Sequence, residues 1–121
     1  MKTIVFDLDG VLRARRTPDL AWYEKRRDYA ALRALYCLCM GAPDWRVAIV
    51  TQEDNGQADT NQVRAGLVKL TLPEPNVLRM VARSETKQSV YAELKPDIVI
   101  DDEIGCIDLA IQEGATTLRV R

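Results

Sequence analysis

The stretch Ile4-Val5-Phe6-Asp7-Leu8-Asp9-Gly10 decides how the rest of the chain is interpreted. Apolar residues are followed at once by two carboxylates, which is typical of a buried strand that ends at the edge of a sheet. Gly10 permits the sharp turn of the backbone that would expose both carboxylates. For this motif taken alone, a polar turn that only terminates the strand is the alternative interpretation.

Short apolar runs alternate with segments of helical spacing along the whole chain, and this order predicts an α/β fold. Ser84 is expected to cap one helix and Pro96 to end it. Helix-containing crossovers predict a Rossmann-like three-layer sandwich, with a five-stranded, mostly parallel sheet and helices on both faces, formed by a single domain over residues 1–121. The expected strands are residues 3–6, 46–50, 77–81, 97–100 and 116–120, and the expected helices are residues 20–40, 58–70, 85–94 and 104–112.

The composition excludes several classes of protein. The 121 residues include 17 basic and 18 acidic side chains and no histidine, so triads and zinc sites that need histidine are excluded. Any acid, base or nucleophile must be another side chain, and the carboxylates are the first candidates. No apolar stretch is long enough for a signal peptide or a membrane span, which predicts a cytoplasmic protein without membrane contact. Cys37, Cys39 and Cys106 are expected to be reduced thiols in or near the core.

Polar residues follow three of the expected strands at their carboxyl ends, where open parallel sheets bind their ligands. They are Asp7, Thr51 and the pair Asp101-Asp102. The run Asp101-Asp102-Glu103 brings carboxylates together that would repel one another without a cation, and Mg²⁺ with oxygen ligands would meet that need. The alternative is that Asp102 or Glu103 caps the next helix.

Lys87 precedes the acidic strand along the chain, at the start of a predicted helix, so it can reach the same edge of the sheet. Lys95 is the alternative lysine for this role. Either lysine taken alone would more simply lie on the solvated surface.

Four motifs in this order give the chain a resemblance to a known family. The sequence resembles the haloacid-dehalogenase-like superfamily, specifically its phosphatases, over nearly its whole length. Ile4-Val5-Phe6-Asp7-Leu8-Asp9-Gly10-Val11 is similar to the first motif of that family, and Val47-Ala48-Ile49-Val50-Thr51 to the second. Lys87 stands at the place of the third motif, and Ile98-Val99-Ile100-Asp101-Asp102 resembles the fourth.

The resemblance implies a role for each motif residue. Asp7 would attack phosphorus to form an aspartyl-phosphate, and Asp9 would protonate the leaving oxygen and then activate water. Thr51 would bind the phosphoryl oxygens, and Lys87 would neutralise their charge. Mg²⁺ would be held by Asp7, by Asp101, by the backbone carbonyl of Asp9, and by Asp102 directly or through water. The implied enzyme is a phosphatase that needs Mg²⁺ and no organic cofactor.

The resemblance has two departures that concern the substrate. Thr51 is followed by Gln52, where many relatives have a small residue or Asn, and then by Glu53 and Asp54, which would face the rim of the site or cap the next helix. The chain is also too short for the cap domain that many relatives carry. A small, capless member would act on a large phosphorylated substrate such as a nucleic-acid end or a protein, or on a small molecule as an oligomer.

Basic and aromatic residues in the first part of the chain bear on the same question. Arginines between positions 13 and 16 would hold flanking phosphates of a polyanion, or would simply be solvated. Aromatic side chains would stack on bases, or would pack against the core. The residues concerned are Arg13, Arg15, Arg16, Trp22, Tyr23 and Trp45.

Two alternatives to a free-standing phosphatase remain open on the sequence. One is a catalytically weak binding or regulatory domain that keeps the fold and the metal site. The other is a phosphatase domain that works only beside a separate partner.

Overall fold

The computed structural model describes residues 1–15, 19–52 and 59–121. These residues form one sheet with helices on both sides, which confirms the predicted α/β fold. The strands are β1 (Lys2–Phe6), β2 (Trp45–Gln52), β3 (Val77–Val81), β4 (Ile98–Asp101) and β5 (Thr116–Arg119). The helices are α1 (Trp22–Lys25), α2 (Tyr29–Met40), α3 (Thr60–Lys69), α4 (Gln88–Leu94) and α5 (Ile104–Gln112).

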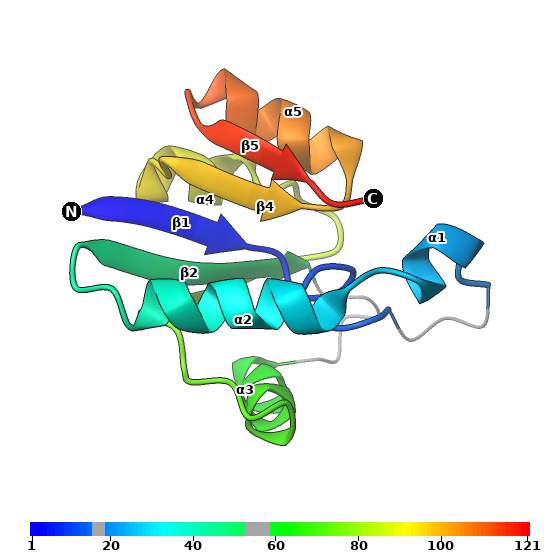
Figure 1. Ribbon diagram of the computed structural model, residues 1–121. Coiled ribbons are helices and arrows are strands. Elements are labelled where there is room, and N and C mark those ends of the chain that lie inside the picture. The colour runs from blue at the N-terminus through cyan, green and yellow to red at the C-terminus, as the bar shows by residue number, and fades with distance from the viewer. Residues whose placement is uncertain (16–18, 53–58) are drawn as a thin grey trace.

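The five strands pair in the order β3-β2-β1-β4-β5, and every pairing is parallel (Figure 1). The chain runs outward from β1 to β3 and then returns to place β4 on the other side of β1. The strand order therefore reverses between β1 and β4, where sheets of this kind bind ligands. The amide of Asp7 donates to the carbonyl of Ile100 at 3.0 Å, so the β1–β4 pairing continues to the first carboxylate.

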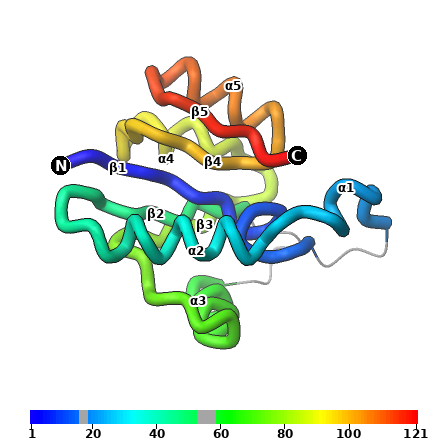
Figure 2. Tube along the Cα trace, in the orientation of Figure 1, coloured from blue at the N-terminus to red at the C-terminus, as the bar shows by residue number. Residues whose placement is uncertain are grey.

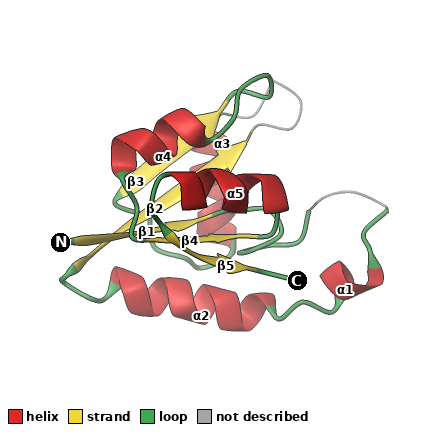
Figure 3. Ribbon diagram, turned by 90° about the horizontal axis from the view of Figure 1, so that it is seen from above, coloured by secondary structure: helices red, strands yellow, loops and turns green. Residues whose placement is uncertain are grey.

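Alternating side chains of the strands supply two separate cores, one on each face of the sheet. Ile4 and Phe6 pack on one face with Tyr36 of α2 and with residues of α3, whereas Val5 packs on the other face with Tyr91 of α4 and with residues of α5. Figure 3 shows α2 on one side of the strands and α4 and α5 on the other. Strands that are apolar at every position are what a sheet covered on both faces requires.

The helix expected over residues 20–40 is wrong in its extent, because the chain forms α1 and α2 with a break between them. Asp28 makes the break, since its side chain accepts a hydrogen bond from the amide of Ala31 at 3.0 Å and thereby caps α2. The short helix α1 lies beyond the carboxyl ends of the strands, away from the sheet (Figure 2). The break separates an element of the core from one that overhangs the edge of the sheet.

The predicted start of α4 is also wrong. Ser84 does not cap this helix, which begins at Gln88 with Lys87 in the N-cap position and no side-chain cap. Residues 82–87 form turns instead, so Lys87 approaches the sheet from a loop. At the other end, Lys95 adopts a left-handed conformation before Pro96, as expected for a helix that stops there.

Three further expectations concern the surface. All three cysteines are free, but Cys37 is exposed on the outer side of α2, which corrects the expectation of a thiol in or near the core, while Cys39 and Cys106 are half-buried. The described residues contain no cap domain, and only six residues join β3 to α4. No helix among them is both long and apolar enough to cross a membrane.

Replacing Tyr36 with phenylalanine tests the core beneath α2. The buried hydroxyl of Tyr36 donates to the carbonyl of Pro73 at 2.7 Å. We expect Tyr36→Phe to lower the free energy of unfolding by about 1 kcal/mol, measured by urea denaturation, because the carbonyl loses its partner. The same change at exposed Tyr23 should cost less than about 0.5 kcal/mol. Equal losses at the two positions would contradict this account.

Candidate functional site

The four residues predicted to be catalytic line one small cleft at the carboxyl edge of the sheet. Asp7 and Asp9 come from the loop after β1, Thr51 from the end of β2, and Lys87 from the turn before α4. The cleft has a volume of about 70 Å³. Its walls also include three residues that the sequence did not single out as catalytic: Arg15, Gln52 and Glu103.

Lys87 connects the ends of β1 and β4 through two buried ion pairs. Its Nζ atom lies 3.0 Å from Oδ1 of Asp7 and 2.9 Å from Oδ2 of Asp101. All three side chains are at most 10% exposed, so little water competes for these contacts. Lys87, and not Lys95, is therefore the lysine that reaches this edge.

Burial and charge act on Asp7 and Lys87 in opposite ways. Burial raises the pKa of Asp7 well above its ordinary value, and the neighbouring Asp101 and Asp102 raise it further, although Lys87 works against them. Burial on its own would lower the pKa of Lys87, but the Asp7 and Asp101 carboxylates raise it well above its ordinary value. Lys87 is thus a permanent cation, whereas the ionised form of Asp7 is disfavoured in the absence of another cation.

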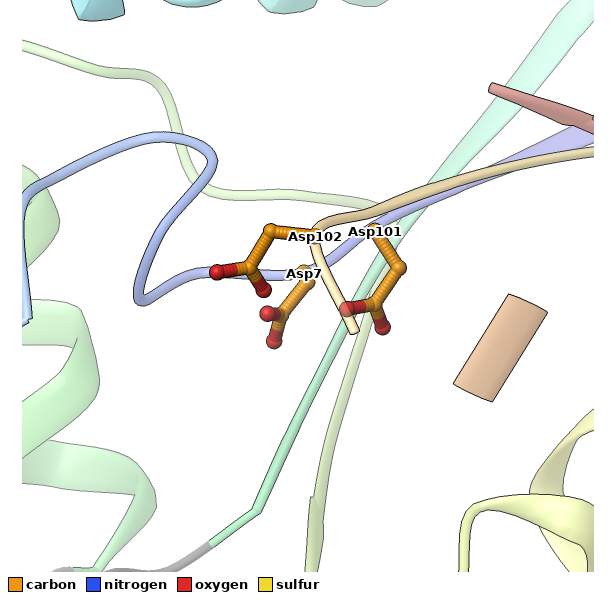
Figure 4. A group of neighbouring side chains, drawn as sticks. All are labelled: Asp7, Asp101 and Asp102. Atoms are coloured by element: carbon orange, nitrogen blue, oxygen red, sulfur yellow. The ribbon is translucent and has the colours of Figure 1, made fainter. Parts of the chain in front are cut away.

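Three carboxylates converge beside this lysine (Figure 4). Asp7, Asp101 and Asp102 can each offer one oxygen such that all three oxygens lie within 4.8 Å of one another. Oxygen ligands at this spacing suit a hard divalent cation. The carboxylate of Asp9 is not part of this group.

Asp102 is held in place by a glycine and an arginine. Gly10 has a φ of +89°, and a Cβ atom at this position would lie only 2.1 Å from Oδ2 of Asp102. Arg27 donates through Nη1 both to the carbonyl of Gly10 and, at 3.3 Å, to Oδ2 of Asp102. The side chains of Arg27 and Asp102 are 4% and 5% exposed, so this ion pair is buried. The sequence gives no local sign of it, because 75 positions separate the two residues.

Asp9 has a charged partner of its own. Nε of Arg13 lies 2.7 Å from Oδ1 of Asp9, and the two side chains are 23% and 21% exposed. The loop that carries them is tightened by a backbone hydrogen bond from Gly10 to Arg13 at 2.7 Å. At least one nitrogen of the Arg13 guanidinium is therefore engaged with a carboxylate of the protein itself.

Gln52 ties the second strand to the loop that carries Lys87. Its side-chain amide donates to the carbonyls of Ala82, Arg83 and Glu85 at 3.4, 3.2 and 2.7 Å. In the sequence this residue was only a departure from the family pattern after Thr51. The structure gives it a positioning role in the loop that presents Lys87.

The remaining predicted residues are not all near the cleft. The capping alternative for Asp102 and Glu103 is wrong, because α5 has no side-chain cap and the carboxylate of Asp101 accepts the amide of Glu103. Trp45 packs against the core, whereas Trp22 and Tyr23 are exposed. Arg15 pairs with buried Glu24. Arg16, Glu53 and Asp54 lie outside the described residues.

Replacing Gly10 with alanine tests the packing of Asp102. We expect Gly10→Ala to lower the free energy of unfolding by more than about 2 kcal/mol, because it adds a clash with Asp102 to the strain of a positive φ. Gly114, whose φ is +82°, has open space around it, so Gly114→Ala measures the strain alone. Thermal or urea denaturation of both variants gives the difference, and a Gly114→Ala loss as large as that of Gly10→Ala would contradict the clash.

Comparison with known proteins adds no family assignment to this geometry. No protein-family model matches the chain, and no curated protein sequence matches it either. The chemistry of the cleft therefore has to be argued from its own residues.

Proposed function

We propose that the protein is a Mg²⁺-dependent phosphomonoester hydrolase of the haloacid-dehalogenase-like type, with Asp7 as its nucleophile. The observation that carries the proposal is the setting of Asp7. It is a buried carboxylate at the end of the central strand, bridged by Lys87 to Asp101 and adjoining Asp102. Phosphoryl transfer needs a nucleophile in line with the leaving oxygen and positive charge near the phosphoryl oxygens. Asp7 would be the nucleophile, and Lys87 beside it would provide part of that charge.

The charges of the described residues support a bound divalent cation. Lys87 and Arg27 are the two buried cations in contact with Asp7, Asp101 and Asp102, so the acids outnumber them. Burial first, and then the charge of Asp101, raise the pKa of both Asp7 and Asp102, so a bound cation would favour the ionised form of each. Asp7, Asp101 and Asp102 would hold Mg²⁺, which would neutralise charge on the phosphoryl oxygens.

The residues of the chain would carry the reaction in two steps. In the first, a carboxylate oxygen of Asp7 bonds to phosphorus, the bond from phosphorus to the leaving oxygen breaks, and Asp9 supplies the proton to that oxygen. In the second, Asp9 accepts a proton from water as the water attacks phosphorus. Inorganic phosphate then leaves, and the Asp7 carboxylate is restored.

Thr51 and Lys87 would position the phosphoryl group for these steps. The hydroxyl of Thr51 can donate to a phosphoryl oxygen, and this side chain is buried at the end of β2 next to the cleft. Lys87 is held by both aspartates at the ends of the two central strands, so its charge is already in place before a substrate arrives.

Removing the carboxylate of Asp7 tests the nucleophile. With Mg²⁺ and a generic phosphomonoester, we expect Asp7→Asn to lower kcat by roughly 1,000-fold or more, because no aspartyl-phosphate can form. Asp9→Asn should lower kcat by about 100-fold to 10,000-fold, since it removes a general acid and base. Asp108→Asn, on the exposed side of α5, is the matched control and should retain activity. A wild-type protein without activity on any phosphomonoester would contradict the proposal.

The effect of the Asp7 charge on the stability of the fold can be tested without measuring catalysis. Its raised pKa means that the folded state binds the proton more tightly than the unfolded chain, so stability falls as pH rises from the ordinary to the raised pKa. Above this range we expect metal-free Asp7→Asn to melt a few degrees higher than metal-free wild type. Added Mg²⁺ should raise the melting temperature of the wild type more than that of Asp7→Asn.

Two results would count against this prediction. A lower melting temperature for metal-free Asp7→Asn would show that Lys87 already compensates the charge of Asp7. An equal response of both proteins to Mg²⁺ would place the bound cation elsewhere.

The ion pair between Arg13 and Asp9 favours a second candidate function. The Asp9 carboxylate lies 2.7 Å from Nε of Arg13, so it would have to leave this partner to reach a leaving oxygen. A domain that keeps the fold and the metal site but has no meaningful turnover would fit this observation. Beryllium fluoride with Mg²⁺ separates the candidates, because a phosphatase should form an aspartyl-phosphate mimic on Asp7. A binding domain would take up the metal without the mimic.

A further inference from the structure

A second and larger cleft adjoins the small cleft that contains Asp7. It has a volume of about 560 Å³, which lies within the usual range for small-molecule sites. Its walls come from α1, from the start of α5 and from the end of β5. The lining residues include Arg15, Trp22, Tyr23, Arg27, Glu103 and Arg119.

The two clefts share part of their walls. Arg15 and Glu103 line both of them. Asp102 lines the larger cleft and also belongs, with Asp7, to the cluster of three carboxylates. A substrate with its phosphoryl group at Asp7 would therefore extend past Arg15 and Glu103 into the larger cleft. The larger cleft is placed to hold whatever carries the phosphate.

One wall of the larger cleft is aromatic and open to solvent. Trp22 is 72% exposed and Tyr23 is 47% exposed, and neither ring belongs to the two hydrophobic cores. The rings meet edge to face, with their centroids 6.1 Å apart. A tryptophan exposed to this extent contributes little to the stability of the fold, but it offers a flat surface on which a planar ring can stack.

The short helix that presents these rings is anchored to the rest of the fold. Glu24 of α1 is 4% exposed, pairs with Arg15 and accepts the amide of Ala21 at 3.0 Å. The hydroxyl of Tyr29, at the start of α2, donates to the carbonyl of Glu24 at 3.0 Å. Trp22 and Tyr23 are thus held at a fixed place beside the site.

The remaining walls carry more donors than the protein itself uses. Arg15 and Arg27 are paired with Glu24 and Asp102, and the Nε atom of each is buried without a partner among the described residues. Arg119 is exposed, and the described part of the chain provides no ion pair for it. The first turn of α5 has no side-chain cap, so its amide donors also remain available. Such a wall suits a ligand rich in acceptors and negative charge.

We propose that the larger cleft binds the nucleoside part of a phosphorylated substrate, with the base against Trp22. The proposal rests on the proposed function, because Asp7 fixes the phosphoryl end of the ligand. A nucleotide combines a flat ring with hydroxyl and phosphate oxygens. Trp22 would stack on the ring, and the donors around Arg119 would bind the oxygens. The same chemistry is found in a free nucleotide and in the phosphorylated end of an oligonucleotide, and the experiment below distinguishes them.

The first measurement compares substrates with and without a base. kcat/KM is measured for nucleoside monophosphates and for glycerol phosphate. We expect Trp22→Ala to lower the ratio of the two values about 10-fold, through a higher KM for the nucleotide. Trp45→Phe alters a core tryptophan at the start of β2 and should leave the ratio unchanged. If the wild type hydrolyses both esters and Trp22→Ala leaves the ratio unchanged, the inference is overturned while the proposed function stands.

A binding measurement keeps the inference testable if no hydrolysis is found. Asp7→Asn combined with Trp45→Phe leaves Trp22 as the one tryptophan of the chain. Saturable quenching of its fluorescence by a nucleoside monophosphate, but not by glycerol phosphate, would support a nucleotide cleft even if the proposed function failed. Absence of quenching would overturn the cleft assignment.

Short 5′- and 3′-phosphorylated oligonucleotides identify the source of the nucleoside. If a nucleic-acid end is the substrate, these should have a higher kcat/KM than the mononucleotides, and Arg119→Gln should weaken the salt dependence of their binding. A mononucleotide substrate predicts the reverse order of kcat/KM. If neither the oligonucleotides nor the mononucleotides have a kcat/KM above that of glycerol phosphate, the proposal is overturned.

Discussion

The site depends on one buried lysine between two strand ends. Asp7 follows β1 and Asp101 ends the neighbouring parallel strand β4, so their charges would repel each other at the same edge of the sheet. Lys87 contacts both at hydrogen-bond distance and comes from the turn before α4. Because it is buried with its partners, each of the three groups is expensive to leave unpaired. The loop before α4 is therefore bound to the central strands by charge as well as by packing.

The order of the strands explains why these groups meet. Chain reversal next to β1 puts the ends of β1 and β4 side by side, and the parallel direction sends both ends to the same edge. Around this frame, Gly10 leaves the space that Asp102 occupies, and Arg27 closes that space from the segment between α1 and α2. A third carboxylate is thereby brought to the first two. The three carboxylates come from two segments of the chain, the loop after β1 and the end of β4, and each segment is fixed by its own contacts.

Much of the fold could be predicted from the sequence, because apolar runs and their spacing report directly on burial. The ends of β3 and α5 agree with the prediction to the residue. The ends of helices were harder to predict from local sequence. Ser84 is a residue type that often caps helices, but it lies in the turn that leads to Lys87 and does not cap α4. Asp28 caps α2 and so interrupts a segment whose apolar residues keep their helical spacing. The convergence of Asp7, Thr51, Lys87 and Asp101 followed from the parallel topology. The ion pairs of Arg13 with Asp9 and of Arg27 with Asp102 could not be predicted in this way, because they depend on the paths of loops, which periodic patterns in the sequence do not report.

The amide of Gln52 has a consequence for how the chain tolerates change. By contacting the carbonyls of Ala82, Arg83 and Glu85, it joins the end of β2 to the turn that leads to Lys87. The end of β2 and the turn that presents Lys87 are thereby joined through one side chain. A replacement of Gln52 would release that turn, so the position of the buried lysine depends on a side chain that carries no charge.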